Sequence, residues 1–588
     1  MKYRRALLHF GHLPILRRLM RRLSFTAILT LLVVSSASAQ QSRWWSPVVA
    51  DSAMVVSAKA EATEVGLDIL RRGGNAADAA IAVHFALAVA LPYAGNIGGG
   101  GFLVWRPADG GVRTYDYREA APLAATADMY LDESGEPLPG RPSWFGPLAV
   151  ATPGSVAGMW LVHQRHGTLP WVELVEPAIR LAADGFPVDA YFHNVIAGKA
   201  DDIRRFPGAS AILLPEGRVP AIGDTLRQPQ LARTLRLIAE QGPEVFYEGE
   251  IADSIVGAME IRGGLVTHED LARYEAKERE PVTFDYRDYT IHSMGPASSG
   301  GITMKLILDQ LEAFDLAEYS WHGARSVHRI VEAMKRAYAV RNAVLGDTDF
   351  VDIPDTIMTE AFARGLAAAI DTLRATPSEE VEPLPGIPVP VAAAEAEQTT
   401  HFSIIDPAGN AVSSTTTING WFGSLETAAG IFLNDEMDDF TLKPGVPNEY
   451  GLVQGEANTI APGKRPLSAM TPTIVERDGR VCYVVGTPGG STIITTVAQI
   501  LIDAIDYGMT FAEALDARRI HHQHLPDVTR VEPFGLSEDT VRALEAMGHE
   551  IDFRNGYSGR AEGIEVGSET GLLYGRSDLR GGGLADGF

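Results

Sequence analysis

A proline-rich segment that runs directly into a threonine-rich strand is the feature that most constrains how this chain of 588 residues can fold. Residues 377–398 contain five prolines and then an Ala/Glu run, a composition typical of an extended, poorly packing linker. The linker ends at Gln398. Strand-like residues 400–405 and 411–418 flank a turn at 406–410, which predicts a β-hairpin. We therefore expect a boundary between two parts of the chain at the bond that follows Gln398.

The N-terminus has the three regions of a secretory signal. Arg21 and Arg22 precede a short apolar stretch, residues 25–34, and a small-residue cleavage site ends at Ala39. We expect residues 1–39 to be a signal peptide and the protein to be exported, to the periplasm or the medium. The apolar stretch is short for a membrane span, so no stable anchor is expected, although a retained anchor is the alternative. Met20 is an alternative start residue.

Composition narrows the class of protein. The formal net charge of -25 argues against a nucleic-acid partner, because phosphate backbones require a basic face. The single cysteine, Cys482, excludes an intrachain disulfide and a multi-cysteine metal site. Helical and strand-like patterns occur in both halves, which predicts a layered α/β or α+β class. The expected helices are residues 61–72, 76–91, 171–184, 230–241, 251–262, 324–340 and 495–506, and the expected strands outside the hairpin are 102–105 and 481–485.

Thr399 can act as a nucleophile if the Gln398–Thr399 bond is cut. It then carries a hydroxyl and an α-amine, and an α-amine with a pKa of about 8 can act as the base for the hydroxyl of the same residue. The same hydroxyl can make the cut, by attacking the carbonyl of Gln398 to form an ester that water hydrolyses. The alternative is that Thr399 only begins a threonine-rich edge strand after a linker.

The residues around Thr399 resemble the autoprocessing site of the γ-glutamyltransferase (γ-glutamyltranspeptidase) family. The string Gln398-Thr399-Thr400-His401-Phe402 carries this resemblance, and further motifs follow in the family's order at residues 94–102, 116–122, 434–440, 464–468 and 486–491. The resemblance implies an N-terminal-nucleophile hydrolase fold, an α+β four-layer αββα sandwich. It also implies that a zymogen cleaves itself into a large subunit, residues 40–398, and a small catalytic subunit, residues 399–588, which stay together as a heterodimer.

The resemblance further implies where a γ-glutamyl group binds. Arg118 would bind its α-carboxylate, because a guanidinium fork holds a carboxylate bidentately, and Ser468 would add a hydrogen bond. Asp439 would bind the α-ammonium, with Asn419 and Glu436 beside it. Acylases of the same architecture cleave glutaryl groups, which carry no ammonium, so Asp439 and Asn419 favour a glutamyl substrate.

The remaining catalytic positions follow from the same resemblance. Thr417 matches the residue whose hydroxyl supports the nucleophile. The backbone N–H groups of Gly489 and Gly490 would form the oxyanion hole, since glycine lets the backbone approach closely. Tyr450 matches a lid loop that limits the access of water and acceptors. No cofactor and no metal are expected.

The expected function is that of a γ-glutamyltransferase or glutathione hydrolase. Thr399 would form a γ-glutamyl-enzyme from a donor such as glutathione and release it to water or to an amino acid or peptide acceptor. A related acylase of the cephalosporin or glutaryl type is the first alternative. A non-catalytic periplasmic binding protein, in which the Gln398–Thr399 bond stays intact, is the second.

Four other groups invite a different interpretation. His401 could be a general base, but packing within its strand is the simpler expectation. The histidines of residues 521–524 could bind a metal, although their spacing is poor for one ion. The run Gly98–Gly101 could cradle phosphate but lacks the ending of a P-loop, and we expect it to pack tightly near the site. Asp438 and Asp439 could bind a cation or form a solvated turn.

Two positions depart from the family's pattern. The family often has two adjacent serines where this chain has Ser468 and Ala469, which removes one possible partner of the substrate carboxylate. Leu579 stands where proline is common. Neither change removes the nucleophile, so the exact substrate is constrained less tightly than the attacking residue.

Overall fold

A computed structural model describes residues 46–384, 399–445 and 454–588. Two compact units are distinguished, residues 1–48 and residues 49–588, and the fold given below is that of the second. The predicted signal peptide, Gln398 and Tyr450 lie outside the described residues. No helix in the described part of the chain is long and apolar enough to cross a membrane.

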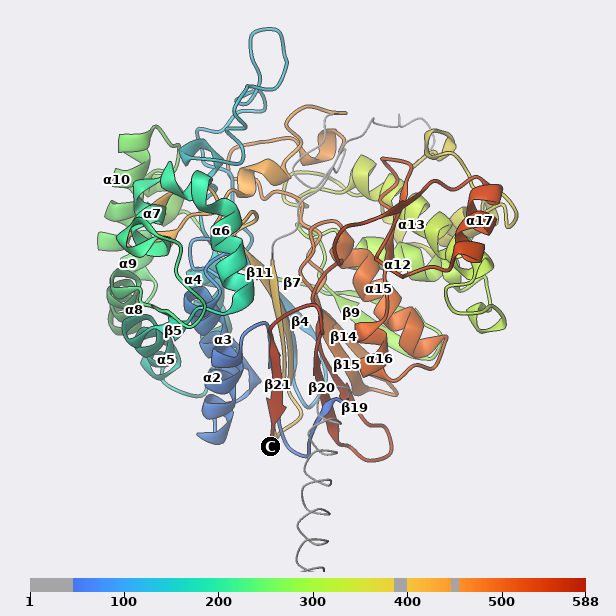
Figure 1. Cartoon of the computed structure of the whole chain (residues 1–588), viewed down its shortest axis with the longest axis horizontal. Coiled ribbons are helices and arrows are strands. Elements are labelled where there is room, and N and C mark those ends of the chain that lie inside the picture. Colours follow the sequence, from blue (N-terminus) through green and yellow to red (C-terminus); the bar gives the residue numbers. More distant parts are fainter. Residues whose placement is uncertain (1–45, 385–398, 446–453) are drawn as a thin grey trace, which may run out of the picture. The chain divides into compact units, whose positions relative to one another are not determined.

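Two seven-stranded sheets form the centre of the fold (Figure 1). The first has the strand order β1 (Val48–Ala50), β20 (Leu573–Ser577), β19 (Glu562–Val566), β15 (Arg480–Gly486), β14 (Thr473–Arg477), β9 (Tyr289–Ser293) and β8 (Val282–Tyr286). The second has the order β21 (Leu584–Gly587), β2 (Met54–Ser57), β10 (Thr400–Ile405), β11 (Ala411–Thr417), β3 (Gly100–Arg106), β4 (Arg113–Asp116) and β7 (Lys277–Arg279). Both sheets therefore combine strands from before and after the expected cleavage point.

Polar side chains fill the seam between the two sheets. β10 lies between β2 and β11, with Thr400 opposite Thr416 in an antiparallel register. The Ser403 hydroxyl donates to the backbone oxygen of Glu562 in the other sheet at 2.9 Å. A ring nitrogen of His401 lies 2.8 Å from the Thr415 hydroxyl. Such hydroxyl-to-backbone bonds satisfy buried polar groups and fix the sheets against each other.

Helices cover the outer face of each sheet (Figure 1). One large apolar core surrounds α3 (Ala76–Ala90) and packs on the second sheet. Another contains residues of α12 (Gly300–Leu311), α13 (Ala324–Val344) and α15 (Thr492–Ile505) and packs on the first. The helices are α2 (Ala60–Arg71), α3 (Ala76–Ala90), α4 (Ser155–His166), α5 (Trp171–Asp184), α6 (Ala190–Arg204), α7 (Pro207–Leu213), α8 (Pro229–Gln241), α9 (Glu244–Tyr247), α10 (Glu250–Arg262), α11 (His268–Ala272), α12 (Gly300–Leu311), α13 (Ala324–Val344), α14 (Glu360–Ala368), α15 (Thr492–Ile505), α16 (Phe511–Asp516) and α17 (Glu538–Met547). This arrangement confirms the predicted α+β class with four αββα layers.

The buried helix α3 shows how local sequence sets this architecture. Asn75 caps it, because its side chain accepts the N–H groups of Ala77 and Asp78 while Asp78 accepts the N–H of Asn75. Every residue of α3 is buried, as expected for a helix that is apolar on all sides. The other predicted helices are also present, although α13 continues to Val344, beyond the predicted end at residue 340.

The beginning of the proline-rich segment is packed, which corrects the expectation of a poorly packing linker for residues 377–384. Ser378 is buried and starts a short 3-10 helix, Ser378–Glu380. Its N–H donates to Asp527 at 2.8 Å, and its hydroxyl donates to the backbone oxygen of His524 at 2.6 Å. Composition missed this anchor because the residues that satisfy Ser378 lie almost 150 positions later. Residues 385–398 lie outside the described part.

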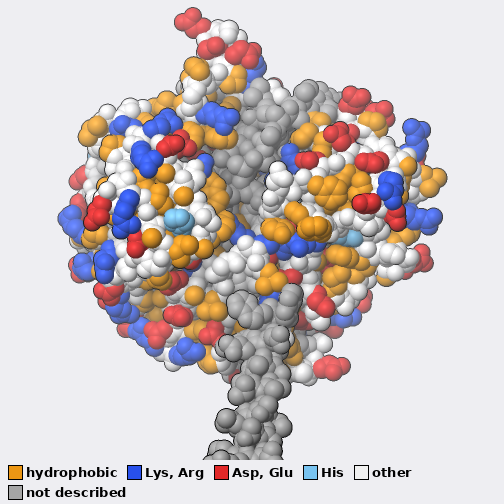
Figure 2. Space-filling view, viewed as in Figure 1, with side chains coloured by type: hydrophobic (Ala, Val, Ile, Leu, Met, Phe, Trp, Pro, Cys, Tyr) orange, Lys and Arg blue, Asp and Glu red, His pale blue; other side chains and the backbone are white. Residues whose placement is uncertain are grey.

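Charged side chains of both signs are interspersed over the helical layers on the face drawn in Figure 2. The net charge of -25 is therefore not expressed as one continuous acidic field on this face. The charges that matter for chemistry are buried, and they lie around Thr399.

Candidate active site

Thr399 lies immediately before β10 and is buried at the wall of a cavity. Its hydroxyl donates to the hydroxyl of Thr417, the last residue of β11, at 3.4 Å. The same cavity is lined by residues from both sides of the expected cleavage point, among them Arg118, Arg341, Asn419, Glu436, Asp439, Ser468, Ala469 and Gly490. The structure thus brings together the predicted nucleophile, its supporting threonine and most of the predicted binding residues.

The turn after β11 positions Asn419 beside the two threonines. Asn419 has a positive φ of 68°, a conformation that asparagine adopts more readily than most residues. Its N–H donates to the Thr417 hydroxyl at 2.9 Å, and its side-chain amide donates to the backbone oxygen of Asp435 at 3.1 Å. Thr417 is therefore held from both sides, which orients its hydroxyl toward Thr399.

A glycine pair approaches the cavity just before α15. Gly489 has a φ of 142° and Gly490 a φ of 54°, both in the region that favours glycine. A Cβ at Gly489 would lie 2.5 Å from the Thr492 hydroxyl, so a side chain there is excluded. Because α15 begins at Thr492, backbone N–H groups and the positive end of the helix dipole both lie near the glycines. This arrangement can stabilise a developing oxyanion.

Arg118 is fully buried and already engaged by acids. Its two Nη atoms form ion pairs with Glu436 and Asp439, and its Nε donates to the backbone oxygen of Pro466 at 3.2 Å. Burial would lower the pKa of Arg118, but the two carboxylates raise it, so the guanidinium stays charged. Arg118 and Asp439, predicted to bind opposite ends of a substrate, thus also contact each other.

Three buried acids share this one guanidinium. The carboxylate oxygens of Glu119 and one oxygen of Glu436 have no hydrogen-bond partner among the described residues. Burial raises the pKa of Glu119 to about 7 and raises that of Glu436 well above its ordinary value; it also raises that of Asp439, where Arg118 opposes it. The pocket is therefore short of positive charge and can hold a proton until a cation arrives.

Arg341, on α13, is a cavity residue that the sequence did not reveal. Its Nε donates to the Ser299 hydroxyl at 2.9 Å and its Nη1 to Asn342 at 2.9 Å, but its Nη2 has no partner in the part of the chain that is described. No carboxylate of the described residues forms an ion pair with it. Burial lowers the pKa of Arg341 to about 10, while Tyr338 and Asp439 oppose that shift. The only sequence signal for Arg341 as a cavity residue is that a charged side chain stands among the apolar residues of a helix.

Ser468 and Ala469 complete the wall next to Arg341. The backbone oxygen of Ser468 accepts hydrogen bonds from both the N–H and the hydroxyl of Ser299, at 2.8 and 2.6 Å. Ser299 in turn accepts from Arg341. Ala469 faces the same cavity and offers no side-chain donor. The cavity is therefore lined by a serine, two guanidinium groups and two acids, Glu436 and Asp439. The third acid, Glu119, lies 3.6 Å from Arg118 and is not part of the lining.

The residues considered above for a general base, a cation site and a phosphate loop make structural contacts instead. His401 lies in the seam between the sheets, where burial lowers its pKa to about 3. Asp438 accepts the Ser143 hydroxyl at 2.6 Å. A Cβ at Gly98 or Gly99 would lie 2.0 or 2.1 Å from a backbone oxygen, of Phe432 and Thr417 respectively, which confirms that the glycine run packs tightly near the site.

The histidines of residues 521–524 make separate contacts. His522 lies 3.2 Å from Asp527, His524 lies 2.9 Å from the backbone oxygen of Ser378, and His521 lies 2.8 Å from the Thr495 hydroxyl. His328, Glu332 and His549 do lie within metal-ligand distance of one another. In that group the two histidines bond each other at 2.7 Å and Glu332 pairs with Arg336, so its ligand atoms are occupied.

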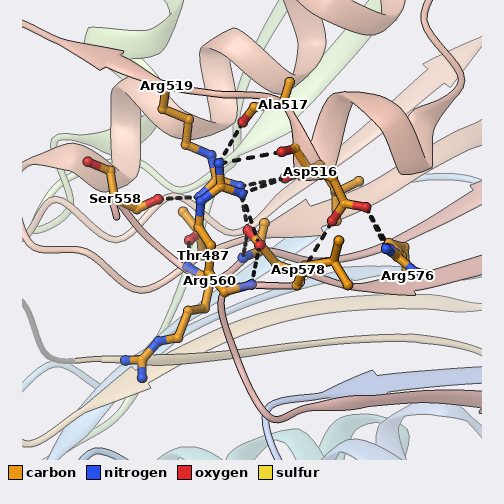
Figure 3. Close-up of polar contacts among 12 residues, drawn as sticks. Thr487, Asp516, Ala517, Arg519, Ser558, Arg560, Arg576 and Asp578 are labelled. Carbon is orange, nitrogen blue, oxygen red and sulfur yellow. Dashed lines mark hydrogen bonds and ion pairs between the residues drawn. The ribbon is translucent and has the colours of Figure 1, made fainter. Parts of the chain in front are cut away.

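A second group of buried charges includes Arg519 and Asp578 (Figure 3). We call it the C-terminal ion network and define it as Arg519, Glu532, Asp578 and Arg580. Both arginines bond Asp578, and Arg580 also bonds Glu532 at 2.6 Å. Arg519 donates to the backbone oxygen of Ser558. Through residues 558–560 the network reaches Thr487, whose hydroxyl accepts the N–H of Arg560 at 3.0 Å.

Comparison with known proteins places these observations in a family context. The model of the Gamma-glutamyltranspeptidase family matches residues 62–588. The chain is 48% identical over 538 residues to a glutathione hydrolase proenzyme of Escherichia coli (strain K12), covering 91% of each chain. It is 42% identical over 542 residues to a protein of the same name from Pseudomonas aeruginosa, covering 91% of this chain and 94% of that one.

Two solved structures agree with the fold. A cephalosporin acylase from Bacillus halodurans superimposes with a TM-score of 0.80 at 26% identity, covering 92% of this chain and 97% of that one. A gamma-glutamyltranspeptidase from Helicobacter pylori superimposes with a TM-score of 0.55 at 39% identity, covering 56% of this chain and 94% of that one.

Proposed function

This chain belongs to the gamma-glutamyltranspeptidase family, and from that premise we propose that it is made as a proenzyme, cuts itself before Thr399 and then acts as a glutathione hydrolase and γ-glutamyltransferase. The observation that carries the proposal is Thr399 itself. It lies at the start of a central strand, bonds Thr417 and lines a cavity with Arg118 and Asp439. Cleavage before Thr399 would make it the first residue of this strand and leave its α-amine free beside its hydroxyl, as an N-terminal nucleophile requires.

Maturation uses the Thr399 hydroxyl against the preceding carbonyl. Oγ attacks the carbonyl carbon of Gln398, the C–N bond breaks, and an ester to Oγ remains while the α-amine of Thr399 is released. Water hydrolyses the ester and leaves a carboxylate on Gln398. Residues 1–39 would be removed on export, so the mature subunits are residues 40–398 and 399–588.

Acyl transfer then follows in the mature enzyme. The α-amine of Thr399 accepts the hydroxyl proton as Oγ attacks the γ-carbonyl of the donor. The N–H groups of Gly489 and Gly490 stabilise the oxyanion; loss of one such donor typically costs about 3 kcal/mol of barrier height. The leaving amine takes the proton, and a γ-glutamyl ester on Thr399 remains. Water or an acceptor amine attacks that ester and restores the hydroxyl.

The charges of the cavity complement the two ends of a glutamyl group. Asp439 and Glu436, with pKa values raised by burial, gain a counter-ion when an α-ammonium arrives. The α-carboxylate gains the remaining N–H groups of Arg118 and the unpartnered Nη2 of Arg341, with Ser468 beside them. Tyr450, outside the described residues, is proposed to belong to a lid over this cavity.

A second candidate is an acylase, because a cephalosporin acylase shares the fold. The excess of buried acids argues against it, since a glutaryl group brings no cation to them. Release of the aniline from γ-glutamyl and glutaryl anilides separates the two, and faster glutaryl release would favour the acylase.

The experiment on the nucleophile uses a gel, N-terminal sequencing and one assay. Wild-type protein should give two bands, the smaller starting at Thr399, and should hydrolyse a γ-glutamyl anilide. Thr399→Ala should give a single band and no turnover, while Thr399→Ser, which keeps a hydroxyl, should still be cut. A Thr399→Ala protein that is cleaved and active would refute the mechanism. Wild-type protein that stays intact and inactive would instead favour a binding protein.

A further inference from the structure

Two segments of the chain line both the cavity at Thr399 and another cavity of about 190 Å³, which we call the Arg465 cavity. Residues 116–121 contribute Arg118 to the cavity at Thr399 and their two alanines to the Arg465 cavity. Residues 463–469 contribute Ser468 to the first and Arg465 to the second. Backbone hydrogen bonds of 2.8 and 2.9 Å join the two segments. A residue on the side of the Arg465 cavity can therefore act on the substrate through Arg118.

The backbone of Arg118 is held at both of its polar groups. Its N–H donates to Oδ1 of Asp116 at 3.0 Å, and its carbonyl oxygen accepts the hydroxyl of Tyr274 at 2.7 Å. Burial raises the pKa of Tyr274, so the hydroxyl stays protonated and able to donate. A Cβ at Gly154 would lie 2.1 Å from this hydroxyl, so the hydroxyl is closely enclosed. These two bonds fix the point from which the Arg118 side chain extends.

Arg465 contacts both of the residues that hold Arg118. Its guanidinium pairs with Oδ1 of Asp116 and donates to the backbone oxygen of the same residue at 3.0 Å. It also donates to the backbone oxygen of Glu275 at 2.6 Å and lies 5.6 Å from the ring centroid of Tyr274. Burial would lower the pKa of Arg465, but Asp116 raises it, so the guanidinium stays charged. One buried guanidinium thus fixes Asp116 and Tyr274 relative to each other.

Asp116 has a further partner that separates this role from simple charge pairing. Nε of Arg279 donates to its Oδ2 at 3.3 Å, and Arg279 is itself bonded to Asp349. Without Arg465 the carboxylate of Asp116 would therefore still have a counter-ion. What would be lost is the link from Asp116 to residues 274–275, which is the part that determines the position of Arg118.

We propose that Arg465 and Tyr274 are positioning residues, which hold Arg118 where its guanidinium can bind the α-carboxylate of a γ-glutamyl donor. Neither is among the described residues that line the cavity at Thr399, so their effect is transmitted through Arg118. Bidentate binding requires the guanidinium and the carboxylate to lie in one plane, so a small displacement of Arg118 weakens it. The inference rests on the proposed function, because it takes Arg118 as the partner of the donor's carboxylate.

The contact also crosses the expected cleavage point. In the proposed mature enzyme Arg465 belongs to the small subunit, while Asp116, Arg118 and Tyr274 belong to the large one. After cleavage the position of Arg118 would therefore depend on a side chain of the other subunit, in addition to the backbone bonds between the two segments.

The test compares two substrates that differ in the α-carboxylate, a γ-glutamyl anilide and a 4-aminobutyryl anilide. In Arg465→Ala the KM for the γ-glutamyl anilide should rise about tenfold or more, while its kcat and the KM for the 4-aminobutyryl anilide should change less than about twofold. Tyr274→Phe, which keeps the ring and removes the hydroxyl, should raise the same KM about three- to tenfold. KM does not depend on the amount of folded enzyme, so partial loss of folded protein does not imitate this result.

Chemical rescue gives a readout that a general loss of structure would not move. Because Arg465 lines the Arg465 cavity, removing its side chain opens the guanidinium site into that space. Methylguanidinium at millimolar concentration should then lower the KM of Arg465→Ala for the γ-glutamyl anilide. It should not do so in Tyr274→Phe, where the Arg465 guanidinium is still in place.

Arg576 provides a matched control, because it is also a buried arginine that is paired with an aspartate, Asp516, and it is not among the described residues that line either cavity. Arg576→Ala should leave the KM for both anilides unchanged. Equal changes on both anilides in Arg465→Ala and Tyr274→Phe, or no change in either variant, would overturn the positioning role. If Arg465→Ala gave no folded protein, Tyr274→Phe would decide by the same criterion. A wild-type enzyme that released no aniline at all would instead refute the proposed function, and this inference with it.

Discussion

The C-terminal ion network and the charges around the cavity beside Thr399 are both buried groups of arginines and carboxylates, and they differ in how completely they are paired. In the C-terminal ion network each oxygen of Asp578 accepts two hydrogen bonds, from Arg519, Arg580 and backbone N–H groups. Burial would raise the pKa of Asp578, but the two arginines hold it below its ordinary value. Beside Thr399, three acids share Arg118 and their pKa values are raised; two of them, Glu436 and Asp439, line the cavity.

The difference separates a structural cluster from a binding site. A buried charge is costly unless fixed donors satisfy it, and the network supplies those donors permanently. Around the cavity, by contrast, both oxygens of Glu119, one oxygen of Glu436 and Nη2 of Arg341 have no hydrogen-bond partner among the described residues, and in the proposed function a ligand brings the opposite charge. A zwitterion such as the end of a glutamyl group brings both. On the proposed function, the unliganded cavity is less favourable because its charges are satisfied only when the substrate binds.

The sharpest way to break this comparison is to neutralise an acid in the network. Asp578→Asn should lower the free energy of unfolding by about 3–5 kcal/mol, because Arg519 would be left buried without its counter-ion and Arg580 would keep only Glu532. Urea unfolding measures this. Asp539→Asn, in a surface pair with Arg542, is the control and should change little. A loss below about 1 kcal/mol for Asp578→Asn would mean that the network is not the paired, structural cluster described here.

The second largest effect is expected at the unpaired arginine of the cavity. Arg341→Gln should raise the KM for a γ-glutamyl anilide about 30-fold, since a charged hydrogen bond contributes about 2 kcal/mol. A 4-aminobutyryl anilide, which lacks the α-carboxylate, should be no worse a substrate of the variant than of the wild type. Arg341→Lys should restore part of the affinity. Equal losses on both anilides would show that Arg341 only supports the wall through Ser299.

The pH dependence of substrate binding comes next in size. With a pKa raised by burial to about 7, Glu119 is protonated below that pH and charged above it. Because only the charged form attracts an ammonium, KM for the donor should fall up to about tenfold between pH 6 and pH 8. KM rather than kcat is the measurement, since the α-amine of Thr399 would titrate in kcat. A KM that is constant over this range would contradict this, because it would mean that Glu119 keeps one charge state and is paired as permanently as Asp578 in the network.

Replacing an acid by its amide should destabilise the network but should be tolerated in the cavity. The pKa of Glu436 is raised in the folded state, so at pH 7 its charge opposes folding and a neutral isostere should not. Glu436→Gln should therefore raise the free energy of unfolding by about 1 kcal/mol at pH 7, with no gain below about pH 4, where the unfolded state is protonated as well. A clear loss of stability at pH 7 would contradict the contrast with Asp578.

The sequence predicted most of the fold because local and pairwise patterns carry it. The helix capped by Asn75 and the hairpin from Thr400 to residue 417 were readable from periodicity and turn residues. Motif resemblance brought Arg118 and Asp439 into one site across more than 300 residues. It could not show that they also pair with each other, because it assigns each residue to the substrate rather than to its neighbours.

What the sequence missed depends on long-range packing. Arg341 and the anchor at Ser378 are satisfied or left open by residues far away in the chain, and no local pattern encodes that. The contacts of Arg465 with Asp116 and Glu275 join distant parts of the chain in the same way. Ala469, by contrast, was visible in the sequence, but its effect could be judged only once Arg341 was seen beside it.

The smallest expected effect therefore concerns Ala469. If Arg341 already supplies a donor to the substrate carboxylate, a second serine hydroxyl should add little. Ala469→Ser should lower the KM for a γ-glutamyl anilide about two- to fivefold, within the about 0.5–1 kcal/mol of one neutral hydrogen bond. In an Arg341→Gln background the same change should help more, because the hydroxyl then replaces a missing donor. Equal gains in both backgrounds would mean that the hydroxyl introduced at position 469 and Arg341 act on different groups of the substrate. The unpartnered Nη2 of Arg341 would then not be the donor to the substrate carboxylate that we propose.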